Sequence, residues 1–448
     1  MDDFRIAYIV EKIIFSEKKH KLFDIKFRRK FSTWPYYRMY FYYALLRNMK
    51  LINFHGGSSN KISFLRLKAF FSLIYNSNLL KLFKKTKIKY AIISTQRYVE
   101  GSEIYTSDIK SLLSTENYIE FSMSDNFNFY KGNIVYLDFF KVFFRVISNT
   151  LKFVFPVSNN VKNFFREFDL NDKFIFQYRI YMIEYRLWFY FYCYFFKKLQ
   201  IEKVFFVSGI YFAPMIAACD KLGITTNEIQ HGIVNKYHLA YNFPSIDRYG
   251  FFANNFLLLS EFWARMASYP INSNLIIIGN DRYFYKKTIS KKDKVITILG
   301  DSILSEQIIK YLINNLTVLI DLEFKVIYKL HPAEFADWKN RYPILDNFSK
   351  ENHVDVYTNE LSLQKIFLDS SFVISVNSTA VYEALDAGCK VLILDLPTSE
   401  YFDEFVQVGI VKLLNYSKML SEKDFDFNPP PLKRFFQKTD FVALKTLV

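Results

Sequence analysis

The chain has 448 residues, which is long enough for two domains with full hydrophobic cores. Hydrophobic residues make up 51% and charged residues 23%, which excludes an intrinsically disordered protein. The formal net charge of +15 favours polyanions or an anionic membrane surface as partners. Nucleic acid is not expected, because the sequence contains no compact Arg/Lys motif of a nucleic-acid-binding module.

Cysteine usage and the apolar runs favour a cytoplasmic protein. Cys193, Cys219 and Cys389 lie far apart and match neither a metal-binding spacing nor a disulfide framework. The N-terminal residues lack the basic and apolar regions of a signal peptide. The run from Leu187 to Phe196 is too short to cross a bilayer, so it predicts a buried helix, with an interfacial anchor as the alternative.

The first half of the chain begins with basic clusters and continues into alternating elements. Lys18-Lys19-His20-Lys21 and Arg28-Arg29-Lys30 stand among helix-like apolar spacings, which predicts solvated faces or contacts with anionic lipid. Residues 89–95 predict a strand followed by a polar loop, and residues 160–200 predict aromatic helices.

A βαβ unit follows over residues 203–232. A strand over 203–207 leads to a helix over 213–222, which Gly223 ends in the usual left-handed conformation. The next strand, over 224–229, ends in Gln230-His231-Gly232. From about residue 250 we expect a helix and then a strand over 275–278.

The second half places polar loops after consecutive buried strands. The strand over 295–299 leads into Gly300-Asp301, where Asp301 is either a helix N-cap or a ligand contact. The alternating, β-branched segment 324–330 leads into His331-Pro332, and Pro332 can begin a helix but cannot continue a sheet. Ligands of open α/β sheets bind at the carboxyl ends of the strands, where His331 is expected.

The most informative stretch runs from Ser375 to Leu385. It joins a buried strand over 371–374 to a short helix through a turn of Ser, Asn and Thr residues. Free N–H groups at such a helix start, flanked by hydroxyls, can bind the phosphate of a nucleotide. The alternative is an ordinary helix cap, since Ser and Thr are preferred there.

The fold class that these patterns predict is α/β, with two Rossmann-like domains facing a cleft and aromatic helices added to the first. We place an acceptor-binding domain at residues 1–250 and a donor-binding domain at 251–448, with the last helix able to cross back.

Four motifs in a fixed order suggest a family: Gln230-His231-Gly232, Gly279-Asn280-Asp281-Arg282, His331-Pro332, and Ser375-x-Asn377-Ser378-Thr379-Ala380-x-Tyr382-Glu383-Ala384. Together, over roughly residues 200–400, they resemble bacterial GT-B-type glycosyltransferases of surface polysaccharide (capsule and lipopolysaccharide) biosynthesis. The most similar groups are the capsule Kdo transferases, the bacterial sialyl- and polysialyltransferases and the CDP-glycerol polymer transferases.

The resemblance implies transfer of a nonulosonic acid such as sialic acid or Kdo from a CMP-activated donor to a surface glycan or glycolipid. It implies that His331 contacts donor phosphate, that Ser378 and Thr379 bind phosphate, and that Glu383 reaches ribose or base. The remaining expected donor contacts are Gly300, Asp301, Pro332, Ser375 and Asn377. No Asp-x-Asp follows a strand of the second half, so we expect a metal-independent reaction without a cofactor.

The catalytic base is less well defined. Related sialyltransferases carry paired acidic residues before Gly in the first half, whereas here Glu100 stands alone before Gly101. The candidates are Glu100, Glu103, Asp108 and His231. Each acid has the alternative of a solvent-facing carboxylate, and His231 the alternative of shaping the cleft.

Three other functions stay open. The first is a transferase whose donor is a UDP-sugar, another NDP-sugar or CDP-glycerol. The second is a sugar-nucleotide epimerase of the same fold, and the third is a non-catalytic subunit of a polysaccharide assembly complex. The basic clusters predict a cytoplasmic protein held peripherally on the inner membrane, where it would meet a lipid-linked glycan acceptor. The sequence does not indicate an oligomeric state.

Overall fold

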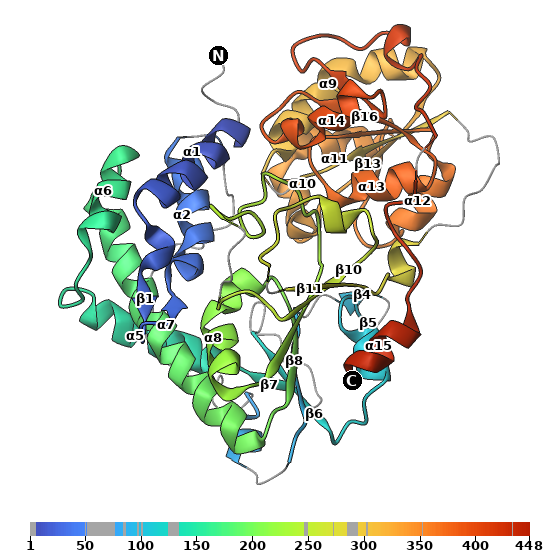
Figure 1. Ribbon diagram of the computed structural model, residues 1–448. Coiled ribbons are helices and arrows are strands. Elements are labelled where there is room, and N and C mark those ends of the chain that lie inside the picture. Colours follow the sequence, from blue (N-terminus) through green and yellow to red (C-terminus); the bar gives the residue numbers. More distant parts are fainter. Residues whose placement is uncertain are drawn as a thin grey trace. The chain divides into compact units, whose positions relative to one another are not determined.

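The structure is a computed structural model (Figure 1). It describes residues 6–448 except 50, 52–76, 84–86, 96–97, 100–101, 124–133, 246–249, 272, 285–293, 302, 352 and 432. The chain divides into two compact units, each made of several segments. The first unit comprises Met1–Glu11, Ala44–Gly57 and Gly279–Thr439, and the second comprises Lys12–Tyr43, Ser58–Ile278 and Asp440–Val448.

The second unit is built on a seven-stranded, wholly parallel sheet. Its spatial order is β7-β6-β3-β8-β9-β10-β11, so the chain winds outward first on one side of β3 and then on the other. This is the doubly wound Rossmann order, whose switch point lies between β3 and β8. The strands are β3 (Tyr90–Ile93), β6 (Tyr118–Ser122), β7 (Ile134–Tyr136), β8 (Lys203–Val207), β9 (Thr225–Ile229), β10 (Asn255–Leu258) and β11 (Asn274–Ile277).

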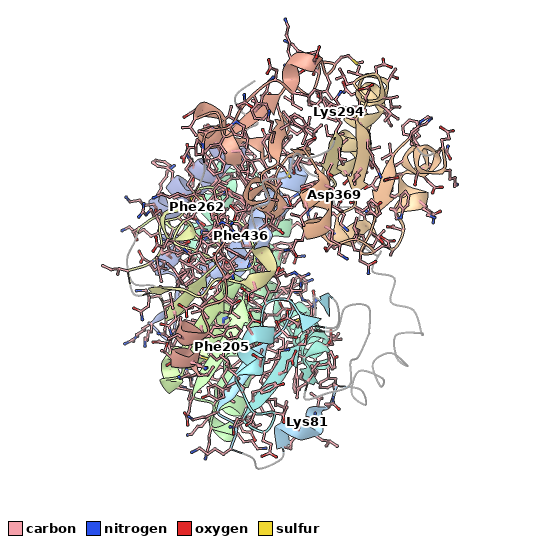
Figure 2. All side chains as sticks on the ribbon, turned by 90° about the vertical axis from the view of Figure 1, so that its right-hand side faces the viewer. Lys81, Phe205, Phe262, Lys294, Asp369 and Phe436 are labelled. Carbon is pink, nitrogen blue, oxygen red and sulfur yellow. The ribbon has the colours of Figure 1, made fainter. Side chains whose placement is uncertain are left out.

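Helices cover both faces of this sheet, as the alternation of side chains along β8 requires. On one face Phe205 and Val207 join a core with residues of α4 (Ser107–Ser111) and α15 (Phe441–Leu447) (Figure 2). On the other side lie α8 (Ala213–Leu222) and the 28-residue α7 (Asp172–Leu199), which pack against each other.

Aromatic side chains form most of the helical layer around α7. It includes α1 (Ile6–Lys19), α2 (Trp34–Asn48), α5 (Asp138–Leu151) and α6 (Asn159–Glu167). Trp34 of α2 is fully buried and packs edge-on against Phe164 of α6, at 5.1 Å between ring centroids. The predicted buried helix over Leu187–Phe196 is confirmed as part of α7. Among the described residues, no helix combines the length and apolar character needed to span a bilayer.

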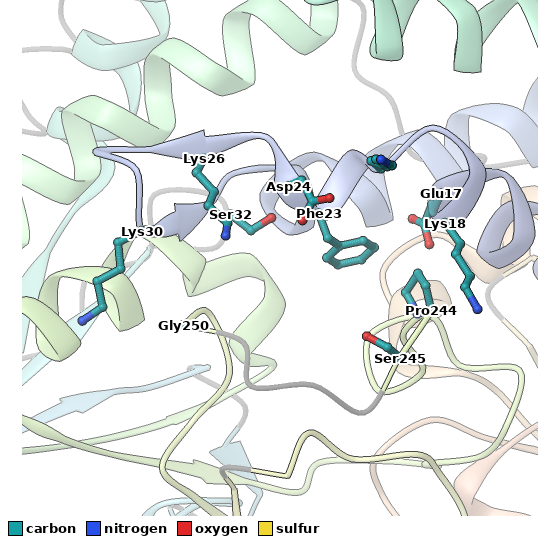
Figure 3. A pocket seen from close by; sticks show the side chains of 11 residues that line it. Glu17, Lys18, Phe23, Asp24, Lys26, Lys30, Ser32, Pro244, Ser245 and Gly250 are labelled. Carbon is teal, nitrogen blue, oxygen red and sulfur yellow. The ribbon is translucent and has the colours of Figure 1, made fainter.

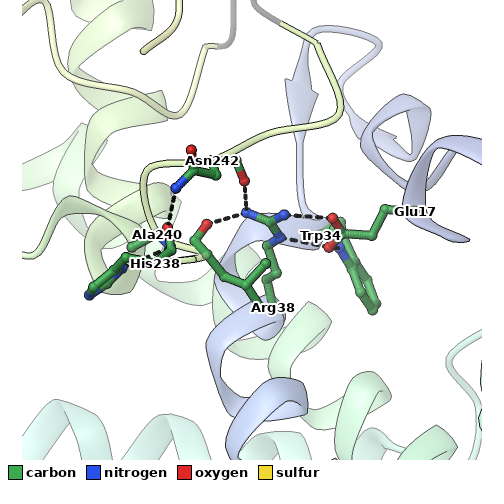
Figure 4. A network of polar contacts seen from close by, with 7 residues as sticks. Glu17, Trp34, Arg38, His238, Ala240 and Asn242 are labelled. Atoms are coloured by element: carbon green, nitrogen blue, oxygen red, sulfur yellow. Dashed lines mark hydrogen bonds and ion pairs between the residues drawn. The ribbon is translucent and has the colours of Figure 1, made fainter. Parts of the chain in front are cut away.

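A buried ion pair ties these helices to the loop after β9 (Figure 4). Arg38 and Glu17 are both fully buried and form two hydrogen bonds of 2.6 Å, while Trp34 Nε1 donates to the same carboxylate. Arg38 also donates to the carbonyl oxygens of Leu239 and Asn242. The guanidinium therefore fixes the course of the chain over residues 239–242.

The first unit contains a six-stranded parallel sheet in the order β14-β13-β12-β15-β16-β17. It repeats the doubly wound order, with its switch point between β12 and β15. The strands are β12 (Val295–Leu299), β13 (Lys325–Lys329), β14 (Asp355–Tyr357), β15 (Phe372–Ser375), β16 (Lys390–Leu394) and β17 (Val411–Leu414).

Helices pack on both faces of this sheet as well. On one face, α9 (Ser305–Asp321) and α11 (Pro343–Lys350) pack on a core that includes Ile296 and Tyr328. α12 (Leu363–Asp369) and α13 (Thr379–Asp386) contact the sheet at β12, β15 and β16. The short elements are β1 (Lys26–Phe27), β2 (Phe31–Ser32), β4 (Tyr98–Val99), β5 (Ser102–Glu103), α10 (Trp338–Arg341) and α14 (Asp403–Gln407).

Two expectations about the middle of the chain differ from the structure. The segment after residue 250 forms strand β10 and a 3-10 turn at Trp263–Arg265 instead of a helix. Its apolar residues are continuous because both faces of a central parallel strand are buried, and such a run resembles a buried helix. β10 and β11 therefore extend the sheet of the second unit, and the compact units change over between Ile278 and Gly279, not at residue 250.

Candidate functional sites at the strand ends

The first candidate site lies at the switch point of the six-stranded sheet. Gly300 follows β12 directly, and its N–H donates to Lys329 O at 2.8 Å. A Cβ at Gly300 would lie 2.9 Å from Glu334 Oε2 and 3.1 Å from His331 N. The absence of a side chain thus lets the loops after β12 and β13 approach each other closely.

A buried carboxylate fixes the backbone at His331. Glu334 is fully buried; its Oε2 accepts from His331 N at 2.8 Å, and its Oε1 accepts from Tyr342 Oη at 2.7 Å. Pro332 opens a 3-10 turn, Pro332–Glu334, rather than an α-helix. The Nδ1 atom of His331 accepts from Ala333 N at 3.1 Å, so in the neutral ring the proton is on Nε2. The imidazole at this strand end is therefore oriented to donate.

The loop after β15 carries an acceptor that lacks a partner. Ser375 is buried at the end of the strand, and Ser378 caps α13 by accepting from Ala380 N at 3.2 Å. Between them, Asn377 Oδ1 is buried and makes no hydrogen bond with any residue that the structure describes. Because an unsatisfied buried acceptor is unfavourable, this oxygen is suited to a ligand hydroxyl or amino group. Thr379 begins the helix and is partly exposed.

Two other polar residues near this switch point hold the backbone. Asp301 Oδ1 accepts from Ile303 N and Leu304 N at 2.8 and 3.0 Å, which caps the turn that leads into α9. Lys329 donates from Nζ to Leu361 O at 3.1 Å, and burial lowers its pKa. Glu383, the expected contact to ribose or base, lies buried on α13.

The second candidate site lies at the switch point of the seven-stranded sheet. Ser208 follows β8 in the left-handed conformation, with φ 58° and ψ 56°, which is uncommon for a residue with a side chain. Its Oγ lies 3.1 Å from Nε2 of His231, the residue in the loop after β9. Tyr105 Oη donates to His231 O at 3.1 Å and so fixes that loop.

Glu228 of β9 is the titratable group at this site. It is 1% exposed, and its Oε1 accepts from Gly209 N at 2.8 Å and from Tyr241 Oη at 3.0 Å. Burial raises the pKa of Glu228 to about 7, although these two hydrogen bonds act in the opposite direction. A carboxyl group with this pKa is ionised in part of the population at neutral pH, as acid–base catalysis requires.

The structure separates the predicted base candidates. Glu100 lies outside the described residues. Glu103 is buried and its oxygens accept from Thr95 Oγ1, Tyr105 N and both the N–H and hydroxyl of Thr106, so its role is structural. Asp108 is partly buried in the first turn of α4. His231 lies at the strand-end site itself.

Sequence reasoning missed Ser208 and Glu228. The signal for Glu228 was available, because an acidic residue inside a buried parallel strand must be neutralised or hydrogen-bonded. No comparable signal marked Ser208, whose left-handed backbone is visible only in the structure. Among the described residues, no group of three or more His, Cys, Asp and Glu side chains is arranged to hold a metal ion.

The fold defines a class of protein with two Rossmann-like α/β domains. In such proteins, the loops at the switch point of each sheet are where ligands bind. No protein-family model matches the chain, and no curated protein matches its sequence. Solved structures with a similar arrangement include UDP-GlcNAc 2-epimerase of Methanocaldococcus jannaschii in complex with UDP-GlcNAc and UDP. It is 12% identical, with a TM-score of 0.43, over 73% of this chain and 89% of that one.

Two further solved structures show the same level of similarity. MurG of Acinetobacter baumannii is 11% identical, with a TM-score of 0.39, over 74% of this chain and 87% of that one. The glycotransferase of kitacinnamycin is 11% identical, with a TM-score of 0.43, over 75% and 88%. Similarity at this level assigns neither an activity nor a ligand to this chain.

Proposed function

We propose that this protein is a GT-B-type glycosyltransferase that uses a nucleotide-sugar donor. The observation that carries the proposal is that three neighbouring parallel strands beside one switch point, β13, β12 and β15, end in loops that carry His331, Gly300 and Asn377, respectively. Switch points of doubly wound sheets are where nucleotides bind. The order of the motifs along the chain, which resembles the polysaccharide transferases, supports the same activity.

The donor is proposed to be a CMP-activated nonulosonic acid. The Nε2–H of His331 and the hydroxyls of Ser378 and Thr379 are donors suited to phosphate oxygens. The unpartnered Asn377 Oδ1 cannot take phosphate and is suited to a ribose hydroxyl or to the amino group of cytosine. A uridine base lacks that amino group, so UDP-sugars and other NDP-sugars are the runner-up donors.

Proton transfer is proposed to take place at the second candidate site. In the transfer, the bond between the anomeric carbon and phosphate breaks, the acceptor oxygen bonds to that carbon, and the hydroxyl proton passes to a base. His231, oriented near Ser208, is the proposed base, and Glu228 is a positioning residue whose ionisation alters the field around Gly209 and Tyr241. The reaction is proposed to need no metal ion.

Nucleotide titration tests the donor site. CMP, CDP and UDP are titrated into the protein and into His331→Ala, Asn377→Ala and Ser378→Ala, with His353→Ala as the control for an exposed histidine of the same unit. Loss of one charge-assisted or buried hydrogen bond should weaken CMP about tenfold, since such bonds contribute roughly 1.5 kcal/mol. If His331→Ala, Asn377→Ala and Ser378→Ala bound CMP as tightly as His353→Ala and the wild type do, the proposed donor site would be wrong.

Product analysis separates the transferase from the two other functions. Release of CMP or UDP from a sugar donor only when a lipid-linked glycan fraction is added supports the transferase. Conversion of a free sugar nucleotide without acceptor would identify an epimerase, and nucleotide binding without turnover would identify a non-catalytic subunit. His231→Gln should abolish turnover while leaving CMP affinity unchanged.

The acceptor is proposed to be presented at an anionic inner-membrane surface. Besides the basic clusters near the N-terminus, α5 and the residues after it expose apolar side chains, with Phe143 at 46%, Val146 at 60% and Phe153 at 67%. Lys141 and Lys152 lie beside them in the chain, and this combination complements an anionic lipid surface.

Vesicle flotation tests the membrane proposal. The wild type should float with phosphatidylglycerol vesicles at low salt and with phosphatidylcholine vesicles far less. The double variant Phe143→Ser/Val146→Ser should lose binding more than tenfold, because each inserted apolar side chain contributes roughly 1.5 kcal/mol or more. The matched control Ile344→Ser/Val442→Ser also changes two exposed apolar residues and should bind as the wild type does.

A further inference from the structure

A basic pocket lies in the second unit, formed by the C-terminal end of α1, the β1–β2 hairpin and the chain around Pro244 (Figure 3). Its volume is about 410 Å³. None of the residues singled out by the strand-end sites lines it. The pocket therefore needs an explanation of its own.

The charges of the pocket are predominantly positive. Lys18, Lys21 and Lys26 line it and make no ion pair within the described parts of the chain, whereas Lys30 pairs with Asp220. Of the acidic lining residues, Glu17 is neutralised by its buried bonds to Arg38. Asp24 is left as the one exposed carboxylate among the described lining residues, so three unpaired ammonium groups outnumber it.

A buried hydroxyl in the pocket has no partner among the described residues. Ser32 is 5% exposed, and its Oγ forms no hydrogen bond within that part of the chain. In the hairpin, Ser32 stands directly across from Lys26, and the two side chains lie side by side at the pocket wall. A hydroxyl beside an ammonium group provides two donors that converge on one ligand atom or group.

The backbone supports this arrangement of cations. Lys21 is left-handed, with φ 48° and ψ 44°, as it turns the chain from α1 toward the hairpin. This conformation is unfavourable for a residue with a side chain and normally belongs to glycine. A lysine at this turn thus places an ammonium group at the pocket despite the backbone strain.

We propose that this pocket binds a phosphate ester, with Lys18, Lys21 and Lys26 neutralising the phosphate and Ser32 donating a hydrogen bond to one of its oxygens. Lysine is a point-charge binder of phosphate, and a hydroxyl can donate to an anion without adding charge. The phosphate belongs either to a phospholipid headgroup or to a soluble phosphate ester. The proposal does not depend on the transferase activity.

Calorimetric titration with inorganic pyrophosphate tests the site. Lys21→Gln and Lys26→Gln should each weaken binding about fivefold, and Ser32→Ala about tenfold, whereas Lys197→Gln, at an exposed lysine of α7 outside the pocket, should have no such effect. Thermal unfolding of each variant checks that Ser32→Ala is folded. Binding that Lys197→Gln weakens as much as Lys26→Gln does, or no binding at all, would overturn the proposal.

Two further arms identify the source of the phosphate and separate this site from the donor site. Competition of pyrophosphate by phosphatidylglycerol vesicles, but not by phosphatidylcholine vesicles, assigns the pocket to a lipid headgroup; no competition by either assigns it to a soluble ester. Lys26→Gln should weaken the binding of pyrophosphate, whereas His331→Ala should bind pyrophosphate as the wild type does. Its loss in His331→Ala would show that pyrophosphate reports the donor site, and would overturn the assignment to the pocket.

Discussion

Each unit packs a glycine, at the end of a strand that flanks the switch point, against a buried glutamate, yet the two glutamates differ in their bonding. Gly300 follows β12 and packs on Glu334, while Gly209 follows Ser208 at the end of β8 and packs on Glu228. Both oxygens of Glu334 accept hydrogen bonds, whereas the bonds of Glu228 converge on Oε1 alone. The bonding thus shows that Glu334 joins two parts of its loop, while the second oxygen of Glu228 accepts none of these bonds.

This difference indicates how one fold provides two kinds of site. In the six-stranded unit, the Glu334 carboxylate orients the backbone of His331. The group suited to a ligand there is the side-chain oxygen of Asn377. In the seven-stranded unit, the titratable Glu228 lies in β9 and accepts from Gly209, the residue after Ser208, whose hydroxyl lies near His231. The proposed division, with donor binding in the first unit and proton transfer in the second, rests on this contrast.

The largest expected effect concerns the support of Glu228. Arg38 holds the loop that carries Tyr241, and Tyr241 donates to Glu228. Arg38→Ala leaves Glu17 buried without its partner, which should lower the free energy of unfolding by about 3 to 5 kcal/mol, as measured by chemical denaturation. The matched change Arg341→Ala, which removes an exposed i,i+4 pair with Asp337, should have an effect of less than about 1 kcal/mol. If both variants lost the same free energy of unfolding, Arg38 would not be the residue that holds the loop with Tyr241.

The next effect is the pH dependence that Glu228 contributes. Its folded-state pKa of about 7 lies above the ordinary value of 4.5, so the folded protein retains a proton that the unfolded chain has released. The contribution of Glu228 to the free energy of unfolding should therefore be complete below pH 4.5 and should fall by about 3 kcal/mol as the pH rises to 7 and beyond, whereas buried His238, whose pKa is lowered to about 4, contributes with the opposite sign. Glu228→Gln should remove this fall.

Denaturation at pH 5 and pH 8 measures this effect. If Glu228→Gln and the wild type kept parallel slopes between these pH values, the raised pKa of Glu228 would be contradicted.

A smaller effect is expected from adding a methyl group at either glycine. Gly209→Ala drives Cβ into the Glu228 carboxylate, and Gly300→Ala meets Glu334 Oε2 at 2.9 Å. Overpacking of this kind should destabilise each variant by about 1 to 3 kcal/mol in thermal unfolding. Gly300→Ala should also weaken CMP binding, whereas Gly209→Ala should lower turnover. Identical functional losses would contradict the division of roles.

The smallest effect is expected from the helix cap at α13. Ser378→Ala removes the bond to Ala380 N and should destabilise the protein by about 1 kcal/mol. Ser158→Ala removes the N-cap of α6, whose side chain accepts from Val161 N, and serves as the matched control. Both variants should lose similar stability, but only Ser378→Ala should bind CMP less tightly.

Local pattern was sufficient to predict much of the chain after residue 200. The strand at 203–207 and the helix at 213–222 have the predicted bounds, because alternation, apolar residues and Gly223 all agree there. The strand at Asn255–Leu258 was mistaken for part of a helix, since burial on both faces removes the alternation that identifies a strand.

The candidate sites were predictable only in part, for a similar reason. His331, Ser378 and Asn377 follow strands in sequence, so topology alone brings them to one sheet edge. The Arg38–Glu17 pair joins residues 21 positions apart and then contacts the chain about 200 positions away, and no local pattern carries that information. The capping bonds of Asp301 likewise became distinguishable from a ligand contact only with coordinates.

The terminal helix α15 has a consequence for how the protein is made. Leu444 and Leu447 complete the core on one face of the seven-stranded sheet, and Lys203 Nζ donates to Leu447 O at 2.8 Å. Most of that sheet is synthesised long before the seven residues of α15 leave the ribosome. We therefore expect the nascent second unit to expose Phe205, Ile229 and Leu257 until α15 has been synthesised, which makes it a client for chaperones that bind apolar surfaces during synthesis.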